Sequence, residues 1–275
     1  MHNERFALLS NSTEEVQANL PYEPISPTLI IFFRQYWYVF LSYLASSRTY
    51  WTLQVILGII APLGLIFFTK TAIGIVTQSQ AIFLLGGDMT MSILFGPSAF
   101  LIILISLANE NKEFDFWMML PVPKLAVVLA IITVSMIFAT PGLICSYILG
   151  SLLLAVPFTG GWMLLPFIPL GVLALTGVGA LLGGLAPNSQ TANVFSNLMI
   201  LSISFLSPMM IPSNAIPWPL RIISYAVPTT YVADAFRAIL AGNTGMDVLV
   251  DAGLLSLFSI VLLMAAQWRL RWRRS

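Results

Sequence analysis

The stretch NENKEFDFWMMLPVPK, residues Asn109–Lys124, is the only cluster of charge in the middle of a very apolar chain. After it, no Asp, Glu, Lys or Arg occurs between Leu125 and Leu220. A helix needs about 20 predominantly apolar residues to cross the hydrocarbon core of a bilayer, so this uncharged stretch must hold several membrane spans. Asn109–Lys124 is therefore predicted to be a short segment at a water-facing surface between two spans.

The composition of the chain excludes an ordinary soluble domain. Of its 275 residues, 58% are hydrophobic and 8% are charged, and the mean hydropathy is +0.91. The net charge of +1 gives no electrostatic basis for binding nucleic acid, so we expect no nucleic-acid partner. Cys145 is the only cysteine and His2 the only histidine, which excludes an intramolecular disulfide and most zinc or histidine-based sites. We expect no catalytic residue, metal or cofactor in this chain.

Apolar runs of sufficient length predict an all-α integral membrane protein with six transmembrane helices in residues 49–268. The six are Tyr50–Thr69, Met89–Ala108, Leu125–Ala155, Met163–Ala186, Ala192–Pro212 and Val248–Trp268. Thr71–Gly87 is more mixed and ends in the turn signal Gly86-Gly87-Asp88, so we expect an outer loop that can dip into the membrane. Pro141 is predicted to bend the third span.

The N-terminal residues divide into a polar cytoplasmic tail, 1–26, and a helical stretch, Pro27–Arg48. Polar side chains recur in that stretch at three- to four-residue spacing: Arg34, Gln35, Tyr38, Ser42 and Ser46. This spacing places them on one face and predicts an amphipathic helix in the cytoplasmic interface of the membrane. A competing interpretation is a seventh span, because Thr28–Ala45 is nearly long enough to cross and Arg34 could extend to the interface.

The distribution of basic residues predicts that both termini are cytoplasmic. Six spans put the termini on one side, together with Asn109–Lys124 and the basic tail 269–275. The opposite side holds Lys70, Arg221 and Arg237, which leaves nine of the 12 Lys and Arg residues on the cytoplasmic side. We expect a multi-pass protein of a bacterial plasma membrane.

The stretch Ser207–Gly242 is mostly apolar but is interrupted by five prolines. It fits two short helices, Trp218–Ala226 and Thr229–Ala241, each too short to cross a membrane. Two such helices back to back predict a re-entrant hairpin at the outer side before the last span. Irregular backbone at that depth requires cover by protein or by a water-filled cavity.

Individual residues in this hairpin have predicted roles. Thr229 or Thr230 is expected to cap the second helix, and Gly242 is expected to end it. Asp234 and Arg237 are three residues apart on that helix and can form an ion pair. The pair is either a structural salt bridge or an outer gate that contacts a polar headgroup.

The charged segment itself has two interpretations. Exposed aromatic side chains between carboxylates are typical of a docking surface for a second protein. The alternative is an interfacial loop whose aromatic side chains lie at the level of the lipid headgroups.

Two motifs resemble the permease subunit of type-2 ABC exporters, in the drug- and lipid-export-like subgroup, from about Pro27 onward. ENKEFDFWMMLPVPK resembles that family's first coupling segment, with matches at Glu110, Leu120, Pro121 and Lys124. VPTTYVADAFRAILAG resembles the family's Asn-Pro-x-Thr-Tyr block that leads into Ala-x-Arg. Its matching residues are Pro228, Thr230, Tyr231, Asp234, Ala235, Arg237 and Gly242. Val227 stands where the family often has Asn, and the first segment lacks the usual Gly-Thr.

The resemblance implies two sites. The residues expected to contact the ATPase are Glu110, Glu113, Phe116, Trp117, Leu120 and Pro121. The residues expected at the outer gate or hairpin are Pro228, Thr230, Tyr231, Asp234 and Arg237. The turn Pro187–Asn193 is a second expected contact with the ATPase.

The resemblance also implies a division of labour between subunits. The phrase nearest to a phosphate-binding loop, GLIFFTKT at 64–71, lacks the second glycine. ATP and Mg would therefore be held by a separate ABC ATPase present in two copies. A second permease copy would complete the transporter, as a homodimer or a paired heterodimer, among membrane lipids.

The uncharged stretch between Leu125 and Leu220 favours an amphipathic or lipid-like cargo that is exported. The two alternative classes are a secondary transporter and a structural membrane scaffold. A secondary transporter normally requires ionisable groups at mid-membrane, and we expect none in the six spans. A structural membrane scaffold would leave the coupling segment without a role.

Overall fold

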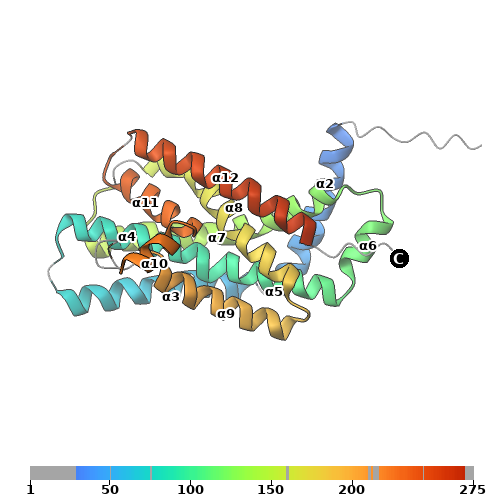
Figure 1. Cartoon of the computed structure of the whole chain (residues 1–275), viewed down its shortest axis with the longest axis horizontal. Coiled ribbons are helices and arrows are strands. Elements are labelled where there is room, and N and C mark those ends of the chain that lie inside the picture. The colour runs from blue at the N-terminus through green and yellow to red at the C-terminus, as the bar shows by residue number, and fades with distance from the viewer. Residues whose placement is uncertain are drawn as a thin grey trace, which may run out of the picture. The chain divides into compact units, whose positions relative to one another are not determined.

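The computed structural model describes residues 29–49, 51–74, 76–158, 161–209, 212, 217–243 and 245–269, and these residues form helices and no strand. The predicted tail 1–26 lies outside them, as does the predicted basic tail 269–275 except for Arg269, which ends the last helix. The helices in chain order (Figure 1) are α2 (Leu29–Ser46), the 3-10 turn η1 (Ser47–Thr49), α3 (Trp51–Ile73), α4 (Gln78–Ile93), the π-turn η2 (Leu94–Ser98), α5 (Ala99–Glu110), α6 (Glu113–Met119), α7 (Lys124–Leu154), α8 (Gly161–Leu185), α9 (Ser189–Leu206), α10 (Trp218–Ser224), α11 (Pro228–Leu240) and α12 (Met246–Arg269).

Five helices in the described residues are long and apolar enough to cross a membrane. They are Val55–Ala72, Gln78–Glu110, Lys124–Leu154, Gly161–Leu185 and Met246–Ala266. Each overlaps one of the six predicted spans. The remaining predicted span, Ala192–Pro212, corresponds to α9, which has 18 residues and includes the polar Gln190, Asn193 and Asn197. Neither α9 nor α2 is among the five.

The predicted outer loop Thr71–Gly87 is wrong. Helix α3 continues to Ile73, and α4 begins at Gln78 and continues through η2 and α5. The start of α4 is fixed locally, because Gln80 Oε1 accepts a hydrogen bond of 3.0 Å from the Thr77 N–H. Gly86 and Gly87, which we interpreted as a turn signal, lie buried inside the helix.

The expectation that the spans hold no ionisable group is also wrong. Because α4 starts early, Asp88 lies within the helical stack Gln78–Glu110, where it is fully buried. Its carboxylate accepts a hydrogen bond from the Ser146 hydroxyl of α7. Asp251 lies within α12 and is half-buried.

The chain divides between Arg34 and Gln35 into two compact units. The N-terminal unit contributes the first turns of α2 to the described residues, where Ile30 and Phe33 are exposed. In the second unit, α2 buries Val39, Phe40 and Tyr43 against its neighbours and exposes Tyr38, Ser42 and Ser46. The predicted helix is therefore observed, but its exposed surface is mixed, because Trp37 and Leu41 are exposed beside Tyr38, Ser42 and Ser46.

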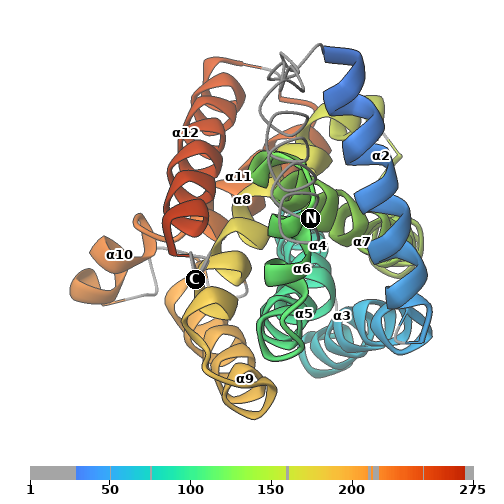
Figure 2. The ribbon, with the colours of Figure 1, turned by 90° about the vertical axis from the view of Figure 1, so that its right-hand side faces the viewer.

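Within the second unit, the stack of α4, η2 and α5 is the central support. Helix α11 packs beside α4, and α6 follows the end of α5, so these two short helices lie at opposite ends of the stack (Figure 1). Helices α3 and α9 lie on either side of α5 (Figure 2). This arrangement places a long helix on each side of a buried one.

Candidate functional site

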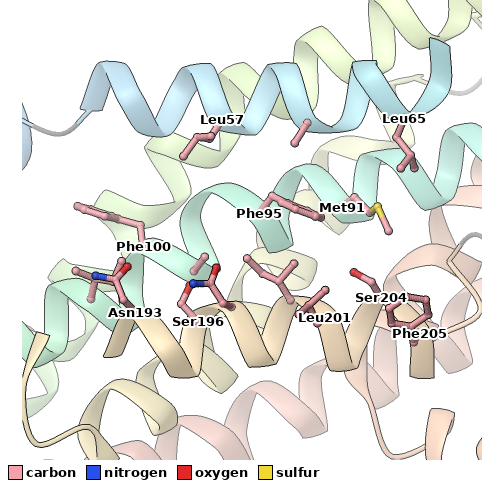
Figure 3. A pocket seen from close by; sticks show the side chains of 15 residues that line it. Leu57, Leu65, Met91, Phe95, Phe100, Asn193, Ser196, Leu201, Ser204 and Phe205 are labelled. Carbon is pink, nitrogen blue, oxygen red and sulfur yellow. The ribbon is translucent and has the colours of Figure 1, made fainter. Parts of the chain in front are cut away.

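A groove of about 810 Å³ lies between α3 and α9, with the α4–α5 stack as its floor (Figure 3). Most of its lining is aliphatic or aromatic, and none of the 15 described residues that line it is charged. They are Leu57, Ala61, Leu65, Met91, Phe95, Ala99, Phe100, Ile103, Asn193, Ser196, Asn197, Ile200, Leu201, Ser204 and Phe205. A mostly apolar pocket with few polar groups is the usual form of a site for an organic ligand.

The polar groups of the groove all come from α9. Ser196 and Asn197 follow Asn193 by three and four residues, and Ser204 follows Asn197 by seven, so the four lie along one side of the helix. The Ser204 hydroxyl is buried and has no hydrogen-bond partner among the described residues. A buried hydroxyl without a partner is costly, so a ligand in the groove would be favoured if it supplied one.

At one end of the stack, the charged segment forms the short helix α6. The predicted exposure of its aromatic side chains is correct for Phe116, which is 57% exposed, and Met119 beside it is 83% exposed. It is wrong for Phe114, which is buried. The reason is the helical period, which turns Phe114 inward when Phe116 faces outward.

Trp117 is half-buried and belongs to the contact between α6 and α2. Its ring is stacked on that of Tyr43, with 6.2 Å between the ring centroids. Burial, followed by the nearby Glu113 carboxylate, raises the pKa of Tyr43 above its ordinary value. Trp117 therefore supports α6 from inside the protein, and Phe116 and Met119 are its exposed apolar residues.

Two pockets flank α6. One, of about 330 Å³, lies on the α2 side and is lined by Ser42, Tyr43, Ser46, Asn111, Lys112, Glu113, Phe116 and Trp117. The other, of about 260 Å³, lies on the side of the α8–α9 turn and is lined by Asn109, Lys112, Phe114, Asp115, Gly184, Ala186 and Pro187. Helix α6 thus stands between two depressions that carry charged side chains.

Glu110, the last residue of α5, connects this region to the start of α9. Its Oε2 accepts a hydrogen bond of 3.1 Å from the backbone N–H of Ser189. Asn188 caps the same helix, since its side-chain oxygen accepts from Thr191 N–H at 2.8 Å. A carboxylate at a helix N-terminus is favoured by the helix dipole. Glu110 therefore joins the floor of the groove to its α9 wall at the α6 end.

After α6 the chain runs through Leu120 and Pro121 into α7. Leu120 is exposed, and the Pro121 carbonyl accepts a hydrogen bond from the side chain of Gln35 in α2. The segment between α5 and α7 is thus held by α2 on one side and by the α9 N-terminus on the other.

At the opposite end of the stack, the two predicted short helices are observed as α10 and α11. The predicted threonine cap of α11 is wrong, because Val227 is at the N-cap position and makes no side-chain cap in the described structure. Pro228 occupies the first turn, where its missing N–H costs nothing. The Thr230 hydroxyl donates instead to the Ser224 carbonyl at 2.7 Å and so joins α11 to α10.

Gly242 ends α11, as predicted. It has φ +75°, and its N–H donates to the Ile239 carbonyl at 3.0 Å. The N–H of Asn243 donates to the Ala238 carbonyl at 2.9 Å. Together these bonds form the capping motif that a residue with positive φ allows.

Arg237 of α11 is the most extensively bonded side chain at this end. It forms the predicted ion pair with Asp234 at 2.9 Å. Its Nη2 also donates to the Pro208 and Met209 carbonyls, both at 2.7 Å. Its Nε donates to the Phe83 carbonyl at 3.2 Å, and the guanidinium lies 3.7 Å from the Phe83 ring centroid. Arg237 thus joins α11, α4 and the backbone that follows α9.

The ionisation of the pair reflects its burial. Burial raises the pKa of the Asp234 carboxyl, and the charge of Arg237 opposes this. Burial lowers the pKa of Arg237, and the charge of Asp234 opposes this. Each partner therefore favours the charged form of the other.

Gly86 and Gly87 allow Arg237 to reach these partners. A Cβ atom at Gly86 would lie 2.6 Å from Arg237 Cγ, and one at Gly87 would overlap the Met209 carbonyl oxygen. Sequence reasoning missed both glycines and the Pro208–Met209 carbonyls as parts of this site. The available signal was the Gly-Gly pair, because adjacent glycines inside an apolar helix also mark a close backbone approach.

With the groove and its two ends described, comparison with known families assigns the chain. Residues 69–268 match the model of a family described as ABC-2 family transporter protein. The chain belongs to this family. A comparison with curated proteins finds no match.

Family membership makes the chain the membrane component of an ABC transporter. It is a multi-pass integral membrane protein and a permease, and its family is not one of catalytic enzymes. An ABC-2 permease is partnered by an ABC ATPase subunit. The match covers the groove-lining parts of α4, α5 and α9, as well as α6 and α11, and begins near the end of α3.

The ABC-2 permease brings its predicted site residues together in two groups. Glu110, Glu113, Phe116, Trp117, Leu120 and Pro121 lie in the segment from the end of α5 to the start of α7. Pro228, Thr230, Tyr231, Asp234 and Arg237 lie in α11. In the second group the Tyr231 hydroxyl donates to the Tyr225 carbonyl at 2.8 Å, a second bond from α11 to the end of α10.

Proposed function

We propose that this ABC-2 permease exports an amphipathic or lipid-like substrate through the groove between α3 and α9. The observation that carries the proposal is the groove itself, which has an uncharged apolar lining and one row of amide and hydroxyl groups. An amphipathic molecule can place its apolar part against α3 and the α4–α5 stack and its polar part against α9. A small ion would find no charged partner there.

The driving force is ATP hydrolysis on a separate ABC ATPase that docks on α6. Exposed Phe116 and Met119, with Glu113 and Asp115 in the first turn of the same helix, provide an apolar and acidic docking surface. Two ATPase copies, which hold ATP and Mg, act with two permeases. The second permease, identical or paired, closes the open side of the groove.

The motion passes from α6 to the groove through Glu110. The carboxylate of Glu110 is bonded to the first turn of α9, and α5 and α9 form part of the floor and one wall of the groove. A rigid tilt of α6 and α5 would therefore shift the start of α9. The end of α9 remains fixed by Arg237 until the substrate leaves past α10 and α11, which form the outer re-entrant hairpin.

The membrane topology of the proposal has six spans, with α9 as the sixth crossing helix and α2 in the cytoplasmic interface. Both termini are cytoplasmic, in a bacterial plasma membrane. The distribution of Lys and Arg supports this orientation. Cysteines at Ser10 and Ser275 in a Cys145→Ser background should both resist an impermeant outer thiol reagent. Labelling of the Ser10 site alone would mean that α2 crosses.

A secondary transporter is the second candidate, favoured by one observation. Asp88 is fully buried in a helix that can cross the membrane. Buried acidic groups of this kind often couple transport to ions. Asp88 is, however, absent from the lining of the groove.

Reconstitution into proteoliposomes tests the proposal. Permease alone and permease with its ATPase are loaded with an NBD-labelled phospholipid or the uncharged amphipathic dye Nile red. We expect movement of a probe only when the ATPase and ATP are present. Movement driven by a pH gradient without the ATPase would identify a secondary transporter. No movement under either condition, with an ATPase that does not co-purify, would identify a structural scaffold.

A further inference from the structure

A second groove, of about 500 Å³, lies between α3 and α7 and is lined entirely by apolar residues. They are Ile60, Leu63, Gly64, Phe67, Leu149, Leu152 and Leu153. On α3 they form a stripe distinct from the residues that face the substrate groove, Leu57, Ala61 and Leu65. The two grooves therefore open on different faces of α3.

The ammonium group of one lysine, Lys70, lies at the end of this apolar groove. Lys70 follows Phe67 by three residues and Leu63 by seven, so it continues the same helical stripe. It is the only charged residue of α3. Its ammonium group donates to the carbonyl of Leu153, itself a lining residue of the groove. A lysine has three donors, so two more can serve an anion at this position.

The groove is open because α3 has a glycine at its floor. Gly64 is exposed, and a Cβ atom added there would meet no atom within 4 Å. The packing of this chain therefore does not require a glycine at position 64. A separate molecule that lies along α3 could therefore occupy the open space at Gly64.

We propose that the α3–α7 groove binds an anionic phospholipid of the surrounding bilayer, with an acyl chain along Gly64 and Phe67 and the phosphate on Lys70. The apolar lining suits a hydrocarbon chain, and the cation at one end suits the headgroup. A lysine near the end of a spanning helix extends toward the headgroup layer. An attraction to anionic lipid is expected for each basic residue at a membrane surface.

The test measures lipid contact at the rim of the groove. A cysteine at Leu152, which is exposed, is labelled with bimane in a Cys145→Ser background, and full-length permease is placed in nanodiscs. The quenchers are brominated phosphatidylglycerol and brominated phosphatidylcholine with identical acyl chains. The same probe at Leu257 on α12, also an exposed apolar position, is the matched control.

We expect phosphatidylglycerol to be enriched at Leu152 by about fivefold over phosphatidylcholine, the factor for one lysine at an anionic surface. The preference should be lost in Lys70→Gln, kept in Lys70→Arg and absent at Leu257. Equal quenching by the two lipids at Leu152, or a preference that survives Lys70→Gln, would overturn the proposal. Weak quenching by both would also overturn it, since a second protein would then cover the groove.

A second variant keeps the test decisive if Lys70→Gln fails to fold. Gly64→Leu fills the groove without changing the charge, and it should lower quenching by phosphatidylglycerol at Leu152. Unchanged quenching would show that the acyl chain lies elsewhere and would overturn the proposal. None of these outcomes depends on which substrate is exported.

Discussion

The two ends of α9 are held in different ways. At its first turn, the Ser189 N–H donates one exposed hydrogen bond to the Glu110 carboxylate. The backbone just after its last turn is bonded twice by Arg237, which is 12% exposed and is also bonded to Asp234 and α4. Helix α9 is therefore fixed firmly at the α11 end (the firm end) and loosely at the α6 end (the loose end). A push from α6 would therefore pivot the helix.

The largest expected effect is at the firm end. Arg237→Ala removes a buried guanidinium together with its ion pair to the half-exposed Asp234 and its bonds to three backbone carbonyls, and should lower the free energy of unfolding by about 3–5 kcal/mol. Thermal unfolding of the purified protein in detergent measures this. Arg221→Ala, on exposed α10, is the control and should unfold as the wild type does.

Exchanging Asp234 and Arg237 separates the contribution of the ion pair from that of the backbone hydrogen bonds. Asp234→Arg with Arg237→Asp keeps the two charges, but places a carboxylate against the Pro208 and Met209 carbonyls. The exchange should therefore be as unstable as Arg237→Ala. Recovery of wild-type stability would show that the ion pair alone, and not the backbone bonds, fixes this end.

The next largest effect is expected on association with the ATPase, which we propose docks on α6 at the loose end. Phe116→Ala should weaken ATPase association by about 30-fold, since an aromatic anchor at an interface is worth at least about 2 kcal/mol. Trp117→Ala should mainly lower stability, because Trp117 packs on Tyr43. Quantitative pull-down of the ATPase, normalised to permease in the membrane, separates the two. Wild-type binding by Phe116→Ala would remove α6 from the docking surface.

Substitution of a glycine at the firm end should lower the free energy of unfolding by about 1–3 kcal/mol. Gly87→Ala forces a methyl group onto the Met209 carbonyl, and overpacking of this kind is destabilising. Gly253→Ala in α12 is a matched control, because an added Cβ there meets no atom within 4 Å. The control should be neutral or more stable, as expected for Gly to Ala in a helix. Equal thermal stability of the two variants would contradict the close approach at Gly87.

The smallest effect is expected at Asp234, whose side chain is 49% exposed. Asp234→Ala leaves Arg237 bonded to the backbone carbonyls, so the loss should be at most about 1 kcal/mol, as for exposed ion pairs. Chemical denaturation in parallel with Arg237→Ala measures the difference. A loss as large as that of Arg237→Ala would mean that the carboxylate positions the guanidinium.

The sequence predicted those features that depend on neighbouring residues. Long apolar runs located five helices able to cross a membrane, prolines located α10 and α11, and the three-residue spacing of Asp234 and Arg237 predicted their ion pair. The contacts of Arg237 with Phe83 and Met209 could not be predicted, because they join residues far apart in the chain. Gly86-Gly87 gave a local signal that fits a turn and a close approach equally well, and only tertiary packing distinguishes them.

In the charged segment Asn109–Lys124, single side chains could not be placed from the sequence either. The composition of Glu113–Met119 predicted an aromatic docking surface, but a helix presents different side chains to opposite sides. Phe116 faces outward, while Phe114 is buried and Trp117 packs on α2. The sequence alone did not reveal that Glu110 would bond to the α9 N-terminus, because that contact requires the fold.

Filling the groove tests most directly that substrate passes between α3 and α9. Asn197 lines the groove and is exposed, so Asn197→Trp should fold and still bind the ATPase. Leu257→Trp adds similar bulk on exposed α12. In proteoliposomes with ATPase and ATP, we predict that Asn197→Trp loses movement of the lipid or dye probe and that Leu257→Trp keeps it. Wild-type transport by Asn197→Trp would show that the substrate does not pass between α3 and α9.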